Sequence, residues 1–259
     1  MKKIIYTLLF FILPLVASSA TLTEQADSAY NKDNFNKALS IYLDIAKNEG
    51  SSSDLYYNIG NTYYRLGNLG KSILFYERAI ALNPNNENAK INLDFVNGKI
   101  IDQTLTPESN ILTNITDSFM SWQSSNGWAV IAIISFILFL LAGMLYIFST
   151  SILFRKIGFF GGVILVIFVI ISNIFAFRMR NKIEDKNSAI ITTQSVTLST
   201  SPRIPKDKSE EAFILNEGTK IMILDSVVNT LDKKGERWYD VKADNAHRAW
   251  INAKNVEVI

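Results

Sequence analysis

Residues 56–86 of the chain read YYNIGNTYYRLGNLGKSILFYERAIALNPNN and predict two helices packed as a hairpin. Small side chains at Gly60 and Ser72 would let the helices approach closely, while larger apolar side chains fill the space between them. Pro84 would end the second helix, because proline lacks the N–H that a helix interior requires. The stretch contains no histidine and no cysteine, so it favours a packing or recognition surface.

The same pattern occurs 34 residues earlier. Residues 30–42, YNKDNFNKALSIY, align without a gap on residues 64–76, YRLGNLGKSILFY. A 34-residue period of paired helices is typical of tetratricopeptide repeats. The second unit resembles that family at its consensus positions, which are Tyr56, Ile59, Gly60, Tyr63, Gly67, Ser72, Tyr76, Ala79 and Pro84. The first unit is degenerate and a third helix near 87–100 would cap the array, so we expect a tetratricopeptide repeat domain over residues 21–100.

The resemblance implies a partner-binding groove lined by the first helix of each hairpin. The candidate groove residues, which share a helical face in each unit, are Tyr57, Asn61, Tyr64 and Arg65, with Asp27, Tyr30 and Asn31 as counterparts. Aromatic rings with asparagine and arginine are common on recognition surfaces. The alternative is that the tyrosines only pack between hairpins. Some relatives clamp a C-terminal carboxylate, and Asn61 fits one clamp position, but Asp27 and Phe95 stand at two others.

Charge and composition narrow the function classes. Residues 21–100 carry 8 Lys and Arg against 9 Asp and Glu, and residues 182–259 carry 12 against 12. Such neutral balances argue against a nucleic-acid partner, which needs a basic surface. With no cysteine and one histidine, the chain has no metal cluster or thiol nucleophile, and no nucleophile–base pair is visible. We therefore expect a non-enzyme with no metal and no cofactor.

Three apolar segments predict export and membrane insertion. Residues 1–20 have the basic start, apolar stretch and small-residue end of a signal peptide. Residues 128–148 and 158–177 carry no charge and are long enough to cross a bilayer as helices. The segments between the domains would be a linker over 101–127, a short cytoplasmic loop over 149–157 and a linker over 178–187.

Export of the first domain would place both soluble domains in the periplasm of a bacterium, anchored in the inner membrane. The basic residues Arg178 and Arg180 oppose this orientation, since cytoplasmic flanks usually carry the excess of Lys and Arg. We expect the signal peptide to decide, because it commits the first domain to export before the spans are made. Asn173 lies within the second span and could bond the first span.

Residues 188–259 alternate apolar and polar side chains and predict four or five short strands. They resemble a bacterial SH3-like domain, a small β-barrel, through Ser201-Pro202, Glu217-Gly218-Thr219, Trp238-Tyr239 and Ala249-Trp250. The resemblance implies a peptide or glycan groove, for which the candidates are Trp238, Tyr239 and Trp250. The alternative is that the tryptophans form the core. The acids Glu210, Glu211, Asp240 and Asp244 are interpreted as surface charges, and His247 as a solvated turn residue.

The order of signal peptide, helical repeats, two spans and SH3-like domain resembles the Bacteroides aerotolerance protein E family over nearly the whole chain. The resemblance implies a scaffold or assembly role in a stress-related membrane complex. Its implied partners are membrane-anchored von Willebrand A-domain proteins of the same operon. The alternative function is a peptidoglycan-binding envelope sensor that acts through the SH3-like domain.

Overall fold

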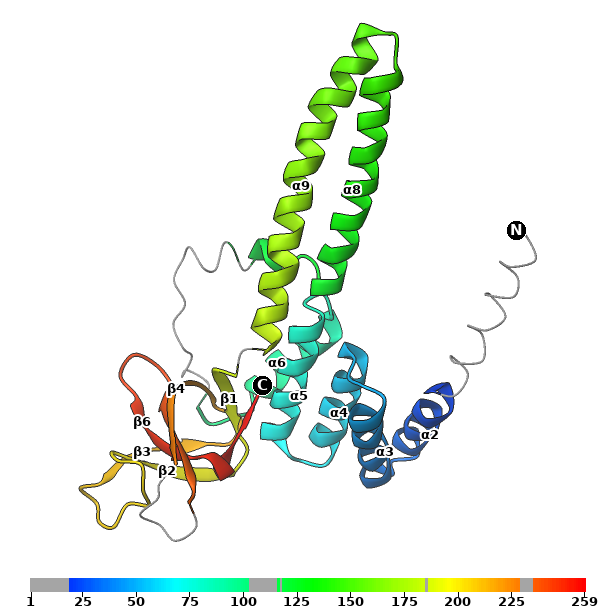
Figure 1. Cartoon of the computed structure of the whole chain (residues 1–259). Helices are drawn as coiled ribbons and strands as arrows, with labels where there is room; N and C mark the ends of the chain where they lie inside the picture. The colour runs from blue at the N-terminus through cyan, green and yellow to red at the C-terminus, as the bar shows by residue number, and fades with distance from the viewer. Residues whose placement is uncertain (1–18, 103–115, 117, 185, 229–234) are drawn as a thin grey trace. The chain divides into compact units, whose positions relative to one another are not determined.

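The chain divides into two compact units in a computed structural model that describes residues 19–102, 116, 118–184, 186–228 and 235–259 (Figure 1). The first unit holds residues 19–80, 86–102 and the C-terminal sheet from residue 186 onward. The second unit holds residues 81–85 and the two long helices. Residues 1–18, which carry most of the predicted signal peptide, lie outside the described residues.

Five helices form the N-terminal part of the first unit: α2 (Ser19–Asn31), α3 (Phe35–Asn48), α4 (Ser53–Arg65), α5 (Leu69–Leu82) and α6 (Glu87–Asn97). Asparagine and serine side chains begin them, since such residues accept a bond from an otherwise unpaired N–H of the first turn. Asn34, Ser52, Asn68 and Asn86 do so for α3, α4, α5 and α6. The turns inside the hairpins place Asp33 and Gly67, 34 residues apart, at positive φ.

The helices pack as the repeat pattern predicts. Gly60 on α4 leaves room for the Tyr76 ring of α5, because a Cβ at Gly60 would lie 2.7 Å from that ring. The Ser72 hydroxyl donates to the Gly60 carbonyl oxygen over 2.9 Å. Leu93 of α6 is buried, as expected for a capping helix. The predicted N-terminal helical array is confirmed.

The C-terminal part is a seven-stranded antiparallel sheet in the order β3-β2-β6-β5-β4-β1-β7. Its strands are β1 (Ser188–Ile191), β2 (Ser195–Ser199), β3 (Glu211–Asn216), β4 (Lys220–Val228), β5 (Arg237–Lys242), β6 (Arg248–Asn252) and β7 (Val256–Val258). The sheet does not close into the predicted β-barrel, since β3 and β7 remain as separate edges.

The β7 edge is covered by helix α5, which gives the physical reason why closure is not needed. Arg78 of α5 donates from Nη2 to the Val258 carbonyl oxygen, and Lys71 pairs with Glu257. Glu77 pairs with Lys220 of β4 over 2.9 Å. Burial lowers the pKa of both Lys71 and Arg78. The helix therefore takes the place that a closing strand would have in a barrel.

Apolar and close backbone contacts join the helices to the sheet as well. Ile190 belongs to the same buried cluster as the helical residues, and Ile259 packs against it. A Cβ at Gly70 would lie 2.7 Å from the Ile191 carbonyl oxygen. Beyond α6, the Asp102 carboxylate accepts bonds from the Asn216 N–H at 2.7 Å and the Thr219 hydroxyl at 2.8 Å. The helices and the sheet form one packed body.

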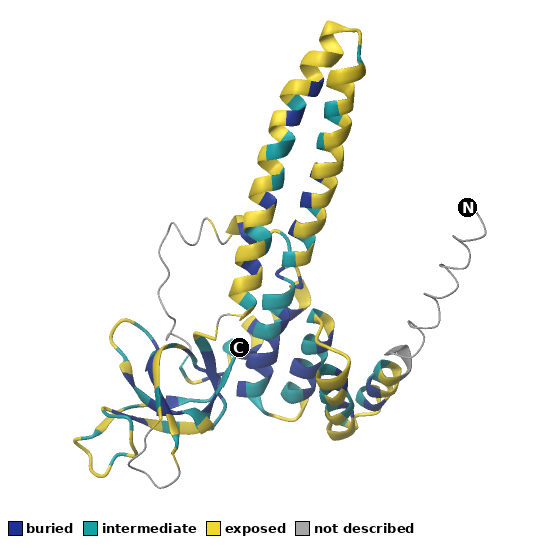
Figure 2. Ribbon diagram, in the orientation of Figure 1, coloured by how far each residue is buried: buried dark blue, intermediate teal, exposed yellow. Residues whose placement is uncertain are grey.

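The second unit is a hairpin of two apolar helices, α8 (Ser125–Phe148) and α9 (Ile152–Glu184). Both are long and apolar enough to cross a membrane. Figure 2 shows exposed residues over most of their surface, unlike the core helix of a soluble protein. Helix α9 continues through residues 178–184, and the connection between the helices is only residues 149–151. The helix therefore extends beyond its apolar run into the polar residues that follow it.

The two helices meet through small residues near their connection. A Cβ at Gly158 would lie 2.7 Å from the Ala142 carbonyl oxygen and 2.8 Å from the Tyr146 nitrogen. At the other end, the Ser125 hydroxyl donates to the Ala176 carbonyl oxygen over 3.0 Å. Asn173 does not bond α8 as expected: its Nδ2 donates to the Val169 carbonyl oxygen of its own helix. Close backbone packing therefore replaces the expected interhelical amide bond.

Candidate functional site

A polar cavity of about 310 Å³ lies between the first helices of the two hairpins. Its lining residues come from α2, α3 and α4: Asp27, Tyr30, Asn31, Tyr42, Asn58 and Asn61. Four of these residues are groove candidates of the sequence analysis, so the structure brings the two predicted sets together. Tyr42 and Asn58 were not predicted as site residues. We call this cavity the Asp27 pocket.

Tyr42 fixes the carboxylate at the base of the pocket. The Tyr42 hydroxyl donates to Asp27 Oδ1, and the Tyr42 side chain is almost fully buried. Burial, with a smaller contribution from the Asp27 hydrogen bond and charge, raises the pKa of Tyr42 well above its ordinary value. The hydroxyl therefore stays protonated and remains a donor at physiological pH. Asp27 is held as an acceptor.

Asn61 links α4 to α5 and α6 through hydrogen bonds. Its Oδ1 accepts bonds from the Tyr76 hydroxyl at 2.6 Å and from Asn92 Nδ2 at 2.8 Å. Asn92 Nδ2 also lies 3.5 Å from the Tyr57 hydroxyl. A carbonyl oxygen has two lone pairs, so Asn61 Oδ1 is saturated and its amide N–H groups remain as donors.

The other predicted groove residues contact different neighbours. The Tyr64 hydroxyl accepts a bond from Lys99 Nζ at 2.7 Å, and the Tyr64 ring lies 5.8 Å from the Phe95 ring. Arg65 turns away from the pocket: it pairs with Asp33 at 2.9 Å and lies 4.3 Å from the Phe35 ring centroid. Tyr57 and Tyr64 are half-buried, so the packing alternative also describes part of their role.

Sequence reasoning missed the contribution of α6 to this face. The 34-residue shift that defines the repeat maps Asn58 onto Asn92 and Arg65 onto Lys99. That shift was sufficient to find both residues, because equivalent positions in stacked repeats line the same groove. We define the groove as the Asp27 pocket together with Tyr57, Tyr64, the α6 residues Ile91, Asn92 and Phe95, and Lys99 in the turn after α6.

The three aromatic candidates of the sheet do not share one face. Trp238 lies opposite Asn252 and Trp250 opposite Asp240, whereas the intervening Tyr239 lies opposite Ile251. Because side chains alternate along a strand, Tyr239 points to the other face, where it packs against the sheet core. Trp238 is 4% exposed and Trp250 is half-buried. Trp238 is therefore buried, on the face opposite to the one where Tyr239 packs.

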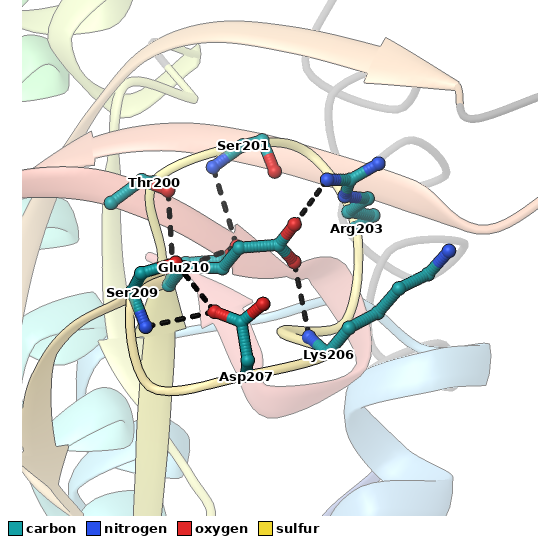
Figure 3. Close-up of polar contacts among 8 residues, drawn as sticks. Thr200, Ser201, Arg203, Lys206, Asp207, Ser209 and Glu210 are labelled. Atoms are coloured by element: carbon teal, nitrogen blue, oxygen red, sulfur yellow. Dashed lines mark hydrogen bonds and ion pairs between the residues drawn. The ribbon is translucent and has the colours of Figure 1, made fainter.

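Asp240 and Glu210, which the sequence analysis interpreted as surface charges, both pair with an arginine. Asp240 is only 6% exposed and accepts two bonds from Arg248, from Nε at 3.1 Å and from Nη2 at 2.6 Å. The strand alternation places Asp240 on the face that carries Trp238 and Trp250, and the paired guanidinium compensates its burial. Figure 3 shows Glu210 at the centre of the turn over residues 200–210, where it pairs with Arg203 and accepts the Lys206 N–H at 3.0 Å. The Lys206 and Arg203 bonds lower the pKa of Glu210.

His247 has a defined environment at its turn. Its Nδ1 lies 2.8 Å from both carboxylate oxygens of Asp244, and its ring meets the Phe213 ring edge-on at 5.0 Å. The contact with His247 lowers the pKa of Asp244. Asp244 also caps the turn by accepting the backbone N–H of Ala246 at 2.8 Å. Within the described ranges, no group of three metal-binding side chains is found.

The comparisons with known proteins identify one element of this site. Residues 53–86 match the Tetratricopeptide repeat family. This is a tetratricopeptide repeat. The match covers α4, α5 and the turn at Pro84, which are the elements that carry Asn58, Asn61, Tyr64 and Tyr76. No curated protein matches the chain. Tetratricopeptide repeats are typical of protein–protein interaction scaffolds.

Proposed function

We propose that this chain is a membrane-anchored scaffold protein that binds a partner protein in its tetratricopeptide groove. The observation that carries the proposal is the Asp27 pocket, which opens between the first helical hairpin and the tetratricopeptide repeat of residues 53–86. The pocket is lined by hydrogen-bonding side chains and contains no nucleophile–base pair. Such a lining suits recognition of a protein segment.

The packing of helices and sheet supports a hairpin topology. Helix α5 precedes the two apolar helices in the chain and the sheet follows them, yet α5 and the sheet share one packed unit. A shared core cannot extend across a bilayer, so both soluble parts lie on the same side when α8 and α9 cross it. The signal-peptide features of residues 1–20 support the periplasm as that side.

The proposed setting comes from the resemblance of the domain order to the Bacteroides aerotolerance protein E family. It makes the chain an assembly factor of a stress-related complex in the bacterial inner membrane, with von Willebrand A-domain membrane proteins as partners. The alternative, a peptidoglycan sensor that acts through residues 188–259, has less support. Trp238 is buried and Tyr239 lies on the opposite face, which leaves only Trp250 for a glycan.

Affinity capture with a blocked groove tests the proposal. Asn58→Arg places a long side chain in the pocket, whereas Asn48→Arg makes the same change at an exposed position near the end of α3. Tagged protein from detergent-solubilised membranes is compared with both variants by quantitative mass spectrometry. Blocking a groove that carries hot-spot contacts is expected to weaken binding by about thirtyfold, equivalent to about 2 kcal/mol.

The expected result is a set of co-purifying membrane proteins that is lost with Asn58→Arg and kept with Asn48→Arg. Equal thermal unfolding of the two variants would show that the fold is intact. Undiminished capture by Asn58→Arg would refute the groove as the docking site. The surface at Trp250 would then be the next candidate. Replacing Tyr57, Asn61, Tyr64 and Arg65 together by alanine would separate binding from stability less well. The Asn61 oxygen also accepts the hydrogen bond of the buried Tyr76 hydroxyl.

A further inference from the structure

The Asp27 pocket contains one charged side chain, and its charge is not neutralised. Asp27 is the only carboxylic acid among the six lining residues. Within the described part of the chain, no ion pair to Asp27 is found. Tyr42 supplies a neutral donor to Oδ1. A half-buried carboxylate has lost part of its hydration, so an entering cation would stabilise it.

The arginine closest in sequence to the pocket lining, Arg65, does not pair with Asp27. Arg65 follows Asn61 by one helical turn, but its guanidinium pairs with Asp33 and stacks on Phe35. Lys99 bonds the Tyr64 hydroxyl and lies 4.3 Å from the Phe95 ring centroid. The chain thus holds its own groove cations at aromatic rings and leaves the carboxylate for another molecule.

The middle of the groove presents a donor next to an acceptor. Asn61 has its oxygen saturated and offers N–H donors, as shown above. Asn92 is the reverse: its Nδ2 is directed at Asn61 and Tyr57, which leaves its Oδ1 as an acceptor. A neighbouring donor and acceptor match the C=O and N–H groups of an extended peptide backbone. This pairing favours a protein segment over a small cation.

The α6 end of the groove is apolar. Ile91 is 63% exposed and Phe95 is 55% exposed, and the two lie one helical turn apart on the same face. Phe95 contacts Tyr64, which places this apolar surface beside the groove residues of α4. An apolar side chain of a bound segment would cover it. The groove is therefore acidic at α2, amide-lined at α4 and apolar at α6.

We propose that the groove binds an extended protein segment whose lysine or arginine side chain enters the Asp27 pocket and pairs with the Asp27 carboxylate. An apolar side chain of the same segment packs on Ile91 and Phe95. This inference rests on the proposed function and adds the chemical class of the partner. It differs from recognition of a C-terminal carboxylate, which a groove with Asp27 at this position would repel.

A peptide selection tests the inference. The full chain in lipid nanodiscs is used to select from a phage-displayed library of random 12-residue peptides, and Asn58→Arg protein is used to discard peptides that bind outside the pocket. Selected peptides are expected to contain a lysine or arginine near an apolar residue. The best arginine peptide is then synthesised together with a version that carries citrulline, a neutral side chain of nearly the same shape.

Asp27→Asn removes the charge and keeps an oxygen that accepts the Tyr42 hydroxyl. Asp44→Asn is the matched control, since Asp44 is exposed on α3 and is not a pocket residue. We expect Asp27→Asn to weaken binding of the arginine peptide at least about tenfold, equivalent to about 1.4 kcal/mol. Citrulline should cause the same loss, and combining the two changes should cause little further loss. Asp44→Asn should leave affinity unchanged.

The outcomes separate this inference from the proposed function. Peptides that bind the wild type but not Asn58→Arg, yet contain no excess of basic residues, would keep the groove function and overturn the cationic partner. The same conclusion follows if Asp27→Asn does not weaken the arginine peptide. Failure to select any peptide that depends on the open pocket would count against both proposals.

Discussion

Gly70→Ala is expected to loosen the contact between helix α5 and the C-terminal sheet. The added Cβ would lie 2.7 Å from the Ile191 carbonyl oxygen, which is 0.7 Å closer than the 3.4 Å of an ordinary contact. It would also lie 3.3 Å from the Gly218 nitrogen. These backbone atoms cannot turn aside, because the Gly218 N–H donates to the Ile191 oxygen over 2.8 Å. Helix and sheet must therefore move apart.

The magnitude follows from overpacking. Forcing extra atoms into a well-packed contact costs about 1–3 kcal/mol, which corresponds to about a 5–150-fold change in the docking equilibrium. Alanine also favours the helix over glycine by about 1 kcal/mol. That gain strengthens α5 itself and does not restore docking. We therefore expect more frequent separation of helix and sheet while the repeat keeps its helical content.

Thiol labelling measures this separation directly, since the natural chain contains no cysteine. Ile100→Cys places a reporter in the contact, because Ile100 is buried and faces Gly218. In this background, Gly70→Ala should raise the labelling rate about 5–150-fold. Gly143→Ala is the control, since a Cβ there meets nothing within 4 Å. Equal labelling rates in both variants would refute the proposed contact.

Three further predictions follow from other parts of the chain. Gly60→Leu should lower the free energy of unfolding by about 1–3 kcal/mol through collision with Tyr76, and an unchanged melting curve would contradict the assigned hairpin. Reporter fusions after Gly98 and after Ile259 should both be active outside the cytoplasm, and activity at only one end would exclude a two-span hairpin. Because the pKa of Glu210 is lowered in the folded turn, its stabilising bonds persist above the ordinary carboxyl range and are lost as pH falls through the folded pKa. The protection of the amides of residues 200–210 against hydrogen exchange, corrected for the intrinsic exchange rate at each pH, should therefore fall on acidification, and Glu210→Gln should reduce this pH dependence.

The helical repeat was predictable because its determinants recur in sequence. Gly60 and Ser72 are small where the helices meet, and the structure shows the close contact that their size permits. The two apolar helices were also predictable, from the length and composition of their sequences. The same 34-residue shift locates Asn92 and Lys99, but their contacts with Asn61 and Tyr64 are seen only in the structure. Repetition thus predicted the fold in detail and the site in part.

The open sheet could not be predicted from the alternation of its strands. Alternation identifies strands and their buried faces, but the partner of an edge strand is decided by long-range contacts. Here the partner of β7 is helix α5, through the pairs Lys71–Glu257 and Arg78–Val258. Both contacts join residues about 180 positions apart, so no local sequence pattern predicts them. For the same reason Asp240 could not be recognised as buried before its pairing with Arg248 was known.

The contact between α5 and the sheet also sets an order of events during synthesis. The face of α5 that carries Gly70 and Arg78 is complete long before β1 begins at Ser188. Roughly 100 residues, including both apolar helices, separate the two, and at about 5–20 residues per second their synthesis takes roughly 5–20 s. During that interval this face is uncovered, while the groove on the other helices is already formed. A chaperone or insertion factor that binds the nascent chain there would compete with the sheet and would leave the groove free for its partner.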